Sequence, residues 1–231
     1  MIVQRLLDGS PRFVTQRDHA LLAGALARAW DVELSEVVYR AIDAHDDPWA
    51  QIDRAPVPDG HGWFHDFVTL PQADRLELYT SGLDAMGDGF AALLTSLHFE
   101  RLLGRHAPDR WRAIEAARQA RIAASLELDE GRLEADLDWL RFFDAASLYA
   151  CMTAPDLDGQ GRPAWLAPGV WTRDPLGRAF VPVWRGPGEL HLRGAPTQNV
   201  THALPCLHRA PMLMRIVATE PKTELPDADA D

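Results

Sequence analysis

The sequence predicts a mainly α-helical fold with a small antiparallel β-sheet appended to it. Apolar residues recur at helical spacing from residue 15 to about residue 150. After Cys151 glycine, proline and tryptophan become frequent, and short runs of strand-like composition follow. The chain has 231 residues and two cysteines, so it is long enough to bury a core without a disulfide framework.

The predicted elements follow from spacing and from turn signals. Strands at 2–3 and 12–14 flank a DGSP turn, and Thr15 with Asp18 forms a capping pattern for a helix over 15–30. A second helix runs from Ser35 to the His45-Asp46 pair, and a proline- and glycine-rich loop covers 47–71. Helices are expected at 72–86, 90–104, 108–126 and 130–150, and strands at 179–183, 189–192 and 212–217.

We therefore expect three regions along the chain. Residues 1–150 form a helical domain that begins with the hairpin, and residues 151–219 form a β-rich extension packed on it. The hairpin is expected to join the C-terminal strands in the appended sheet. Residues 220–231 are an acidic tail of disordered composition.

Charge and composition narrow the function classes. The net charge is -11, with 34 acidic and 23 basic residues, which argues against nucleic acid as a general partner. No apolar run approaches the roughly 20 residues that a bilayer span needs, and the N-terminus has no signal-peptide pattern, so a cytoplasmic protein is expected. Lys222 is the only lysine, so arginine, backbone amides or a metal would have to hold an anionic substrate.

Polar residues with metal-ligating side chains interrupt three apolar helix faces. His19 shares its face with Leu22 and Leu26, and the faces that lead to the His45-Asp46 pair and to Asp144 are likewise apolar. A single buried histidine is usually a hydrogen-bonded core residue. The ordered occurrence of such residues on three helices favours one shared metal site, because a divalent cation would satisfy all of them at once.

His19, His45, Asp46 and Asp144 resemble, in order and helical placement, the pattern of the HD-domain superfamily of metal-dependent phosphohydrolases. The resemblance spans about residues 15–150 and implies an HD-domain-like helical bundle with a bound metal. The segments QRDHALLAG (16–24), AIDAHDDPW (41–49) and SLHFERL (96–102) also resemble an uncharacterised bacterial family of unknown function. His and carboxylate ligands together suit Mn, Fe, Co, Ni or Zn rather than calcium.

His98 is the candidate fifth ligand, because its helix face is apolar and two-metal members of the superfamily add histidines before the last Asp. One or two ions are therefore expected. Where many members of the superfamily carry Gly-Lys after the His-Asp pair, this chain has Asp47-Pro48-Trp49. Arg54 or Arg17 would then have to contact a substrate phosphate.

Further candidates lie in the 47–71 loop. Trp49, Trp63, Phe64 and Phe67, with Asp53, are expected to form an aromatic, partly polar wall over the metal. His61 and His65 are interpreted as solvated. We assign Asp46, Asp53 and Arg54 as the catalytic candidates.

Three functions fit these residues. The first is a metal-dependent hydrolase, a phosphoesterase that acts on a small-molecule substrate through metal-activated water. The second is a di-iron oxygenase, since some relatives in the superfamily use two irons to activate oxygen. The third is a non-catalytic, metal-stabilised ligand-binding protein, which the missing lysine motivates.

Overall fold

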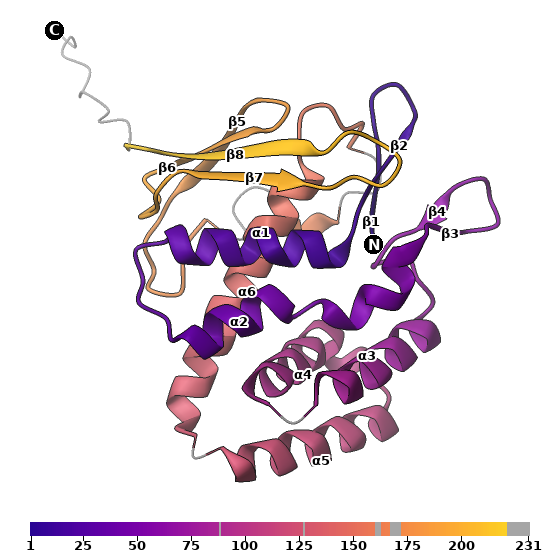
Figure 1. Ribbon diagram of the computed structural model, residues 1–231, viewed down its shortest axis with the longest axis vertical. Helices are drawn as coiled ribbons and strands as arrows, with labels where there is room; N and C mark the ends of the chain where they lie inside the picture. Colours follow the sequence, from indigo (N-terminus) through magenta and orange to yellow (C-terminus); the bar gives the residue numbers. More distant parts are fainter. Residues whose placement is uncertain (88, 127, 160–162, 167–171, 221–231) are drawn as a thin grey trace, which may run out of the picture.

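The computed structural model describes residues 1–87, 89–126, 128–159, 163–166 and 172–220 (Figure 1). Within these residues the α-helices are α1 (Gln16–Ala29), α2 (Glu36–Ala44), α3 (Gln72–Met86), α4 (Phe90–Leu103), α5 (Asp109–Ser125) and α6 (Glu130–Met152). Short 3-10 helices are η1 (Asp47–Arg54), η2 (Gly104–His106) and η3 (Ala164–Leu166). The strands are β1 (Ile2–Arg5), β2 (Pro11–Val14), β3 (Val57–Pro58), β4 (Phe64–His65), β5 (Val181–Gly186), β6 (Glu189–Arg193), β7 (Val200–Leu204) and β8 (Met212–Thr219).

The fold is mainly α-helical with small sheets, as predicted, and the expected helices are confirmed with small differences at their ends. The capping pattern at the start of α1 is also confirmed. The Thr15 hydroxyl oxygen accepts a hydrogen bond from the Asp18 backbone N–H at 2.9 Å, which satisfies one of the free amides of the first turn. This cap fixes where α1 begins and therefore which face presents His19.

Helix α1 lies between the C-terminal sheet and the other helices (Figure 1). Long α6 crosses behind α1, and α3, α4 and α5 lie at the end of the molecule opposite the sheet. Leu22 and Leu26 of α1 are buried in one core cluster with Leu140 of α6 and with Leu192 and Ile216 of the sheet. The β-rich region and the helices thus share a continuous apolar core, which holds α1 and α6 in fixed register.

The prediction of one antiparallel sheet that includes the N-terminal hairpin is wrong. β1 and β2 form their own two-stranded sheet, and the C-terminal sheet has the order β5-β6-β8-β7. β8 inserts between β6 and β7, so it pairs antiparallel with β7 and parallel with β6. The strand β7 was not predicted, because only Val200 and Leu204 at its two ends are buried and its middle residues give no alternating apolar signal.

The segment 47–71 is not an unstructured loop as expected. Pro48 stands at the start of η1, where its missing N–H costs nothing, and β3 and β4 form a small hairpin further on. Trp49 is 2% exposed and packs edge-to-face on Tyr79 at 5.7 Å between ring centroids. The segment that follows the His-Asp pair is therefore folded onto α3.

Two further sequence expectations concern the C-terminal tail and the membrane. The predicted acidic tail lies outside the described residues from residue 221 onward. Among the residues that the structure does describe, no helix combines the length and apolarity that a membrane crossing requires.

The contact of η1 with α3 depends on a glycine, and we predict that Gly82→Ala destabilises the fold. A Cβ at Gly82 would lie 2.3 Å from Pro48 Cβ and 2.4 Å from Pro48 Cα, so η1 would have to move away from α3. We expect the free energy of unfolding in urea to fall by about 1–3 kcal/mol. Gly186→Ala is the control, because a Cβ there meets nothing within 4 Å; equal losses in both variants would contradict the packing argument.

Candidate metal centre

Four helices bring the predicted ligands to one buried place. His19 lies in the first turn of α1, His45 is the C-cap of α2, Asp46 follows it, His98 lies in α4 and Asp144 in α6. All five residues are buried, with between 0% and 7% of their surface exposed. The structure thus brings these five side chains together in the interior.

The tautomer of His19 is fixed by Ser147, one turn along α6 from Asp144. The Ser147 hydroxyl donates to the Asp144 backbone carbonyl at 2.9 Å, so its oxygen is left to accept from His19 Nδ1–H at 2.8 Å. As a neutral metal ligand, His19 would therefore carry its lone pair on Nε2. In the protein alone, that atom lies at hydrogen-bond distance from Asp46 Oδ2, 2.6 Å, and 3.7 Å from Asp144 Oδ1.

His45 has the same orientation for a different reason. Its Nδ1 lies 2.7 Å from the Ile42 carbonyl oxygen, which can only accept, so Nδ1 carries the hydrogen and Nε2 carries the lone pair. His45 Nε2 is a buried atom with no hydrogen-bond partner within the described residues. It lies 3.5 Å from Asp144 Oδ1 and 3.6 Å from Asp46 Oδ2.

Asp144 faces two groups of histidines with its two oxygens. Oδ1 points to His19 and His45, while Oδ2 lies 3.4 Å from His98 Nε2. The imidazole of His98 stands edge-to-face to that of His45, with 5.5 Å between ring centroids. A carboxylate with histidines facing both of its oxygens could lie between two cation positions, and the number of ions remains a prediction.

The electrostatics of the centre are those of a cation site. Burial opposes the protonation of His45, but the charges of Asp46 and Asp144 outweigh it and raise its pKa to about 9. Burial opposes ionisation of Asp144, yet contact with the surrounding histidines lowers its pKa to about 2. At His98 burial dominates and lowers the pKa to about 4, so this ring is neutral and can act as a ligand. In the protein alone, a proton on His45 therefore occupies the position that a metal would take.

The ligand atoms also fit a metal by distance. One ligand atom each of His19, His45 and Asp144 lies within 4.8 Å of the others, and ligands on opposite sides of an octahedral ion are separated by about 4.2 Å. Asp46 is closer, since its Oδ2 is at hydrogen-bond distance from His19 Nε2. These residues can hold a divalent transition metal if Asp46 and His19 separate slightly on binding.

A cavity of about 350 Å³ opens onto one edge of this centre. Asp46, His98 and Asp144 form its polar floor, and its walls include Trp49, Phe67, Tyr79, Phe99, Leu102, Leu148 and Trp165. Tyr79 stacks on Phe99 with 3.8 Å between ring centroids, and burial raises the pKa of its phenol above the usual value. Tyr79 therefore stays protonated and can donate a hydrogen bond.

The arginines expected to contact an anion are not at this cavity. Arg54 is exposed on η1, and Arg17 is exposed and pairs with Asp47 at 3.0 Å; neither lines the cavity. Arg101 and Arg141 line it instead. Sequence reasoning missed both, although each stands three residues from a predicted ligand, a spacing that places two side chains on one helix face.

Asp53 has a structural position rather than a place at the metal. Its Oδ2 accepts from the Gln16 backbone N–H at 2.7 Å and faces the Arg17 N–H at 3.4 Å, both in the first turn of α1. Its Oδ1 pairs with the Met1 ammonium group at 2.8 Å. The carboxylate thus stabilises the N-terminus of the helix that carries His19.

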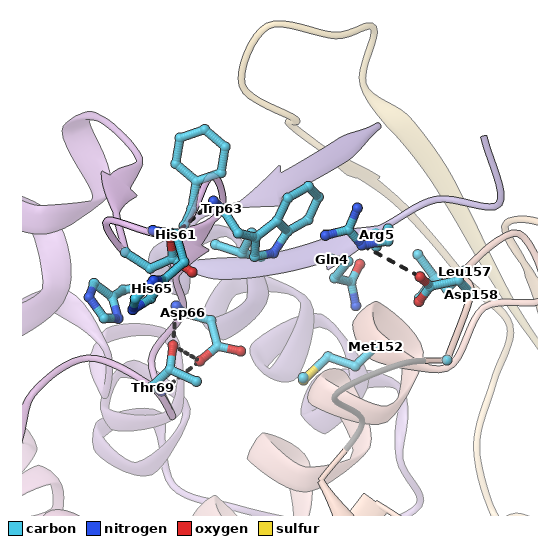
Figure 2. Close-up of a pocket in the computed structure, with 14 residues that line it drawn as sticks. Gln4, Arg5, His61, Trp63, His65, Asp66, Thr69, Met152, Leu157 and Asp158 are labelled. Atoms are coloured by element: carbon cyan, nitrogen blue, oxygen red, sulfur yellow. Dashed lines mark hydrogen bonds and ion pairs between the residues drawn. The ribbon is translucent and has the colours of Figure 1, made fainter. Parts of the chain in front are cut away.

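Half of the expected aromatic wall lies elsewhere. Trp49 and Phe67 line the metal cavity, but Trp63 and Phe64 line a second cavity of about 460 Å³ together with His61 and His65. Figure 2 shows this second cavity between the β1 strand, the β3–β4 hairpin and the end of α6. There the Arg5 guanidinium lies 3.7 Å from the Trp63 ring centroid. The hairpin carries these aromatic residues away from the metal ligands.

Comparison with known proteins places the chain in a family. Residues 1–202 match the family described as "Protein of unknown function (DUF3891)". The chain belongs to this family. The match covers the hairpin, all the ligand-bearing helices and the sheet as far as β7, and the description assigns no activity. No curated protein and no solved structure matches the chain.

We predict that Asp53→Asn lowers stability and leaves metal binding intact. The amide keeps an acceptor for the α1 amides but loses the charge that faces the Met1 ammonium group, so the free energy of unfolding should fall by about 1–3 kcal/mol. Urea unfolding and elemental analysis of the purified variant measure the two effects. Asp59→Asn, at a partly exposed carboxylate that also accepts from backbone amides, is the control. Loss of metal without loss of stability would show that Asp53 belongs to the centre.

We predict that Ser147→Ala weakens metal binding by about 10–100-fold, because His19 loses the acceptor that sets its tautomer. Competition against a metal-chelating dye measures the dissociation constant. Ser125→Ala is a matched control, since Ser125 makes the same helical hydrogen bond to a carbonyl three residues back but lies in α5 away from the ligands. Unchanged affinity in Ser147→Ala would contradict the tautomer assignment.

Proposed function

We propose that the chain is a metal-dependent hydrolase that cleaves phosphoesters of small molecules with metal-activated water. One observation carries this proposal. Two buried imidazole Nε2 atoms, of His19 and His45, converge on the carboxylates of Asp46 and Asp144, and a cavity meets the same carboxylates. A metal that only stabilised the fold would need no cavity beside it.

The helical arrangement supports the resemblance to the HD-domain superfamily as part of this proposal. Ligands come from the start of α1, the end of α2, α4 and α6, in the order His, His-Asp, His and Asp. Each is held by its own helix, so the bundle sets the geometry before a metal arrives. We include an HD-domain-like bundle in the proposal on this basis.

In the proposed reaction, the metal ligand Asp46 and the cavity residue Tyr79 have separate roles. When bound, a divalent transition metal supplies Lewis-acid chemistry, because it lowers the pKa of water and polarises the phosphoryl oxygen. Asp46 belongs both to the ligand group and to the cavity floor, so its carboxylate is placed to accept the proton of the attacking water. The water oxygen forms a bond to phosphorus, the ester P–O bond breaks, and the departing alcohol takes a proton. Tyr79, a protonated donor in the cavity wall, is the group available to that alcohol.

A di-iron oxygenase is the second candidate, and one specific contact favours it. Asp144 Oδ2 faces His98 while Oδ1 faces the other two histidines, which suits two ions sharing one carboxylate. The aromatic walls of the cavity would accept a small organic molecule. This candidate requires iron at both positions and an optical change on exposure of the reduced protein to oxygen.

Metal content and turnover test the proposal together. We expect the purified or metal-reconstituted protein to hold at least one transition metal per chain, and to hydrolyse members of a phosphoester panel. His45→Ala and Asp144→Asn should each lose metal and reduce turnover by at least about 100-fold, because each removes a ligand. His61→Ala, a histidine of the second cavity, should change neither quantity.

The outcomes separate the candidates. Stoichiometric metal without any phosphoester turnover would remove the hydrolase, and an oxygen-dependent optical change would then select the oxygenase. Metal with neither activity would leave a ligand-binding protein. Absence of metal after reconstitution would overturn all three assignments to this centre.

A further inference from the structure

Two arginines lie three residues from candidate metal ligands, one in α4 and one in α6. Arg101 follows His98 by three residues in α4, and Arg141 precedes Asp144 by three residues in α6. A separation of three residues corresponds to about 4.5 Å along a helix and nearly one turn. Both arginines line the cavity that has His98 and Asp144 on its floor, so both side chains belong to the wall next to that floor.

The two arginines lie on the same side of the ligands because the helices run in opposite directions. His98 of α4 contacts Asp144 of α6, and Arg101, further along α4, contacts Glu134, which is earlier in α6. Going forward in α4 and backward in α6 therefore leads to the same end of the cavity. Arg141 is also close enough to His98 to contribute to lowering its pKa.

Both guanidinium groups keep donors for a ligand. Among the described residues, Arg101 binds Glu134 through Nη2 alone, and Arg141 approaches Asp138 through Nη1 at 3.5 Å. Each side chain is about half exposed, with 51% and 48% of its surface accessible. A guanidinium has five N–H donors in a planar fork that matches the oxygens of a phosphoryl group.

The remaining walls are apolar and aromatic. Trp49 packs edge-to-face on Tyr79, Tyr79 stacks on Phe99, and the lining continues with Leu102, Leu148 and Trp165. Such walls bind a flat ring by contact and by edge-to-face packing, and they offer few partners to a polyhydroxylated or strongly polar group.

We propose that this cavity binds phosphomonoesters of small ring-bearing alcohols, with Arg101 and Arg141 holding the phosphoryl oxygens and the aromatic walls holding the ring. This assignment rests on the proposed function and names its substrate class. A monoester presents three terminal oxygens and a charge near -2, which two arginines and a metal can all contact at once. A diester has two such oxygens, less charge and a second substituent to place in about 350 Å³.

Calorimetric binding of phenylphosphonate to the metal-loaded protein tests the assignment without requiring turnover. We expect Arg101→Gln and Arg141→Gln each to weaken binding by at least about 10-fold at unchanged metal content, because each removes a charged donor. Methylphosphonate, which lacks the ring, should bind at least about 10-fold more weakly than phenylphosphonate. Arg132→Gln is the matched control, since Arg132 is an exposed arginine of α6 that pairs with Asp136 outside the cavity.

The results distinguish this inference from the proposed function. Arginine-dependent binding of phenylphosphonate without hydrolysis of phenyl phosphate supports the ligand class and removes the hydrolase. Hydrolysis of phenyl phosphate with the same KM in both arginine variants supports the hydrolase and overturns the inference. No binding of phenylphosphonate, or equal binding of the methyl and phenyl compounds, also overturns it.

Discussion

The candidate metal centre places the negative charges of two carboxylates in the interior of the protein. The carboxylates of Asp46 and Asp144 lie buried against the Nε2 atoms of His19 and His45, and each of these Nε2 atoms can bind either a proton or a metal. Four electron-rich groups in a low-dielectric interior repel one another unless a cation joins them. The tautomers follow from the helices themselves. Ile42 lies in the last turn of α2, where backbone carbonyls have no helical partner, so its oxygen is free to bind His45.

The same packing explains why the chain lacks a lysine after the His-Asp pair. Pro48 sits against Gly82 of α3 at a distance that excludes any Cβ, and Trp49 is buried beside Tyr79. Pro48 and Trp49 are therefore fixed by their packing, and neither side chain carries a charge that could bind an anion. Positive charge at the cavity comes instead from Arg101 and Arg141, on helices that also carry candidate ligands. If the cavity binds an anion, as proposed, these two arginines rather than residues 47–49 would hold it.

Helical periodicity predicted most of what is local to one helix. The spacing of apolar residues gave the six helices, and it placed His19, His98 and Asp144 on their buried faces. Contacts between different elements could not be predicted from helical periodicity. Whether Trp63 or Phe67 reaches the metal cavity depends on the path of the β3–β4 hairpin. The parallel pairing of β8 with β6 follows from the insertion of β8 between β6 and β7, which no local pattern indicates. Asp53 was assigned to catalysis because nothing in its local pattern shows that it meets the start of α1, 37 residues earlier.

Protons and metal compete for the same atoms, and the competition links the site to the fold. The pKa of His45 rises from 6.5 to about 9 in the folded protein, so its protonation stabilises the metal-free fold fully below pH 6.5, and this contribution is lost as the pH rises through 9. Asp144 acts in the opposite sense, since its lowered pKa stabilises the fold above pH 3.8 and this is lost as the pH falls toward 2. A bound cation would replace the proton on His45. Such a metal would therefore gain affinity over the alkaline range in which the metal-free centre loses the stabilising charge on His45, and it would then hold the four ligand-bearing helices together.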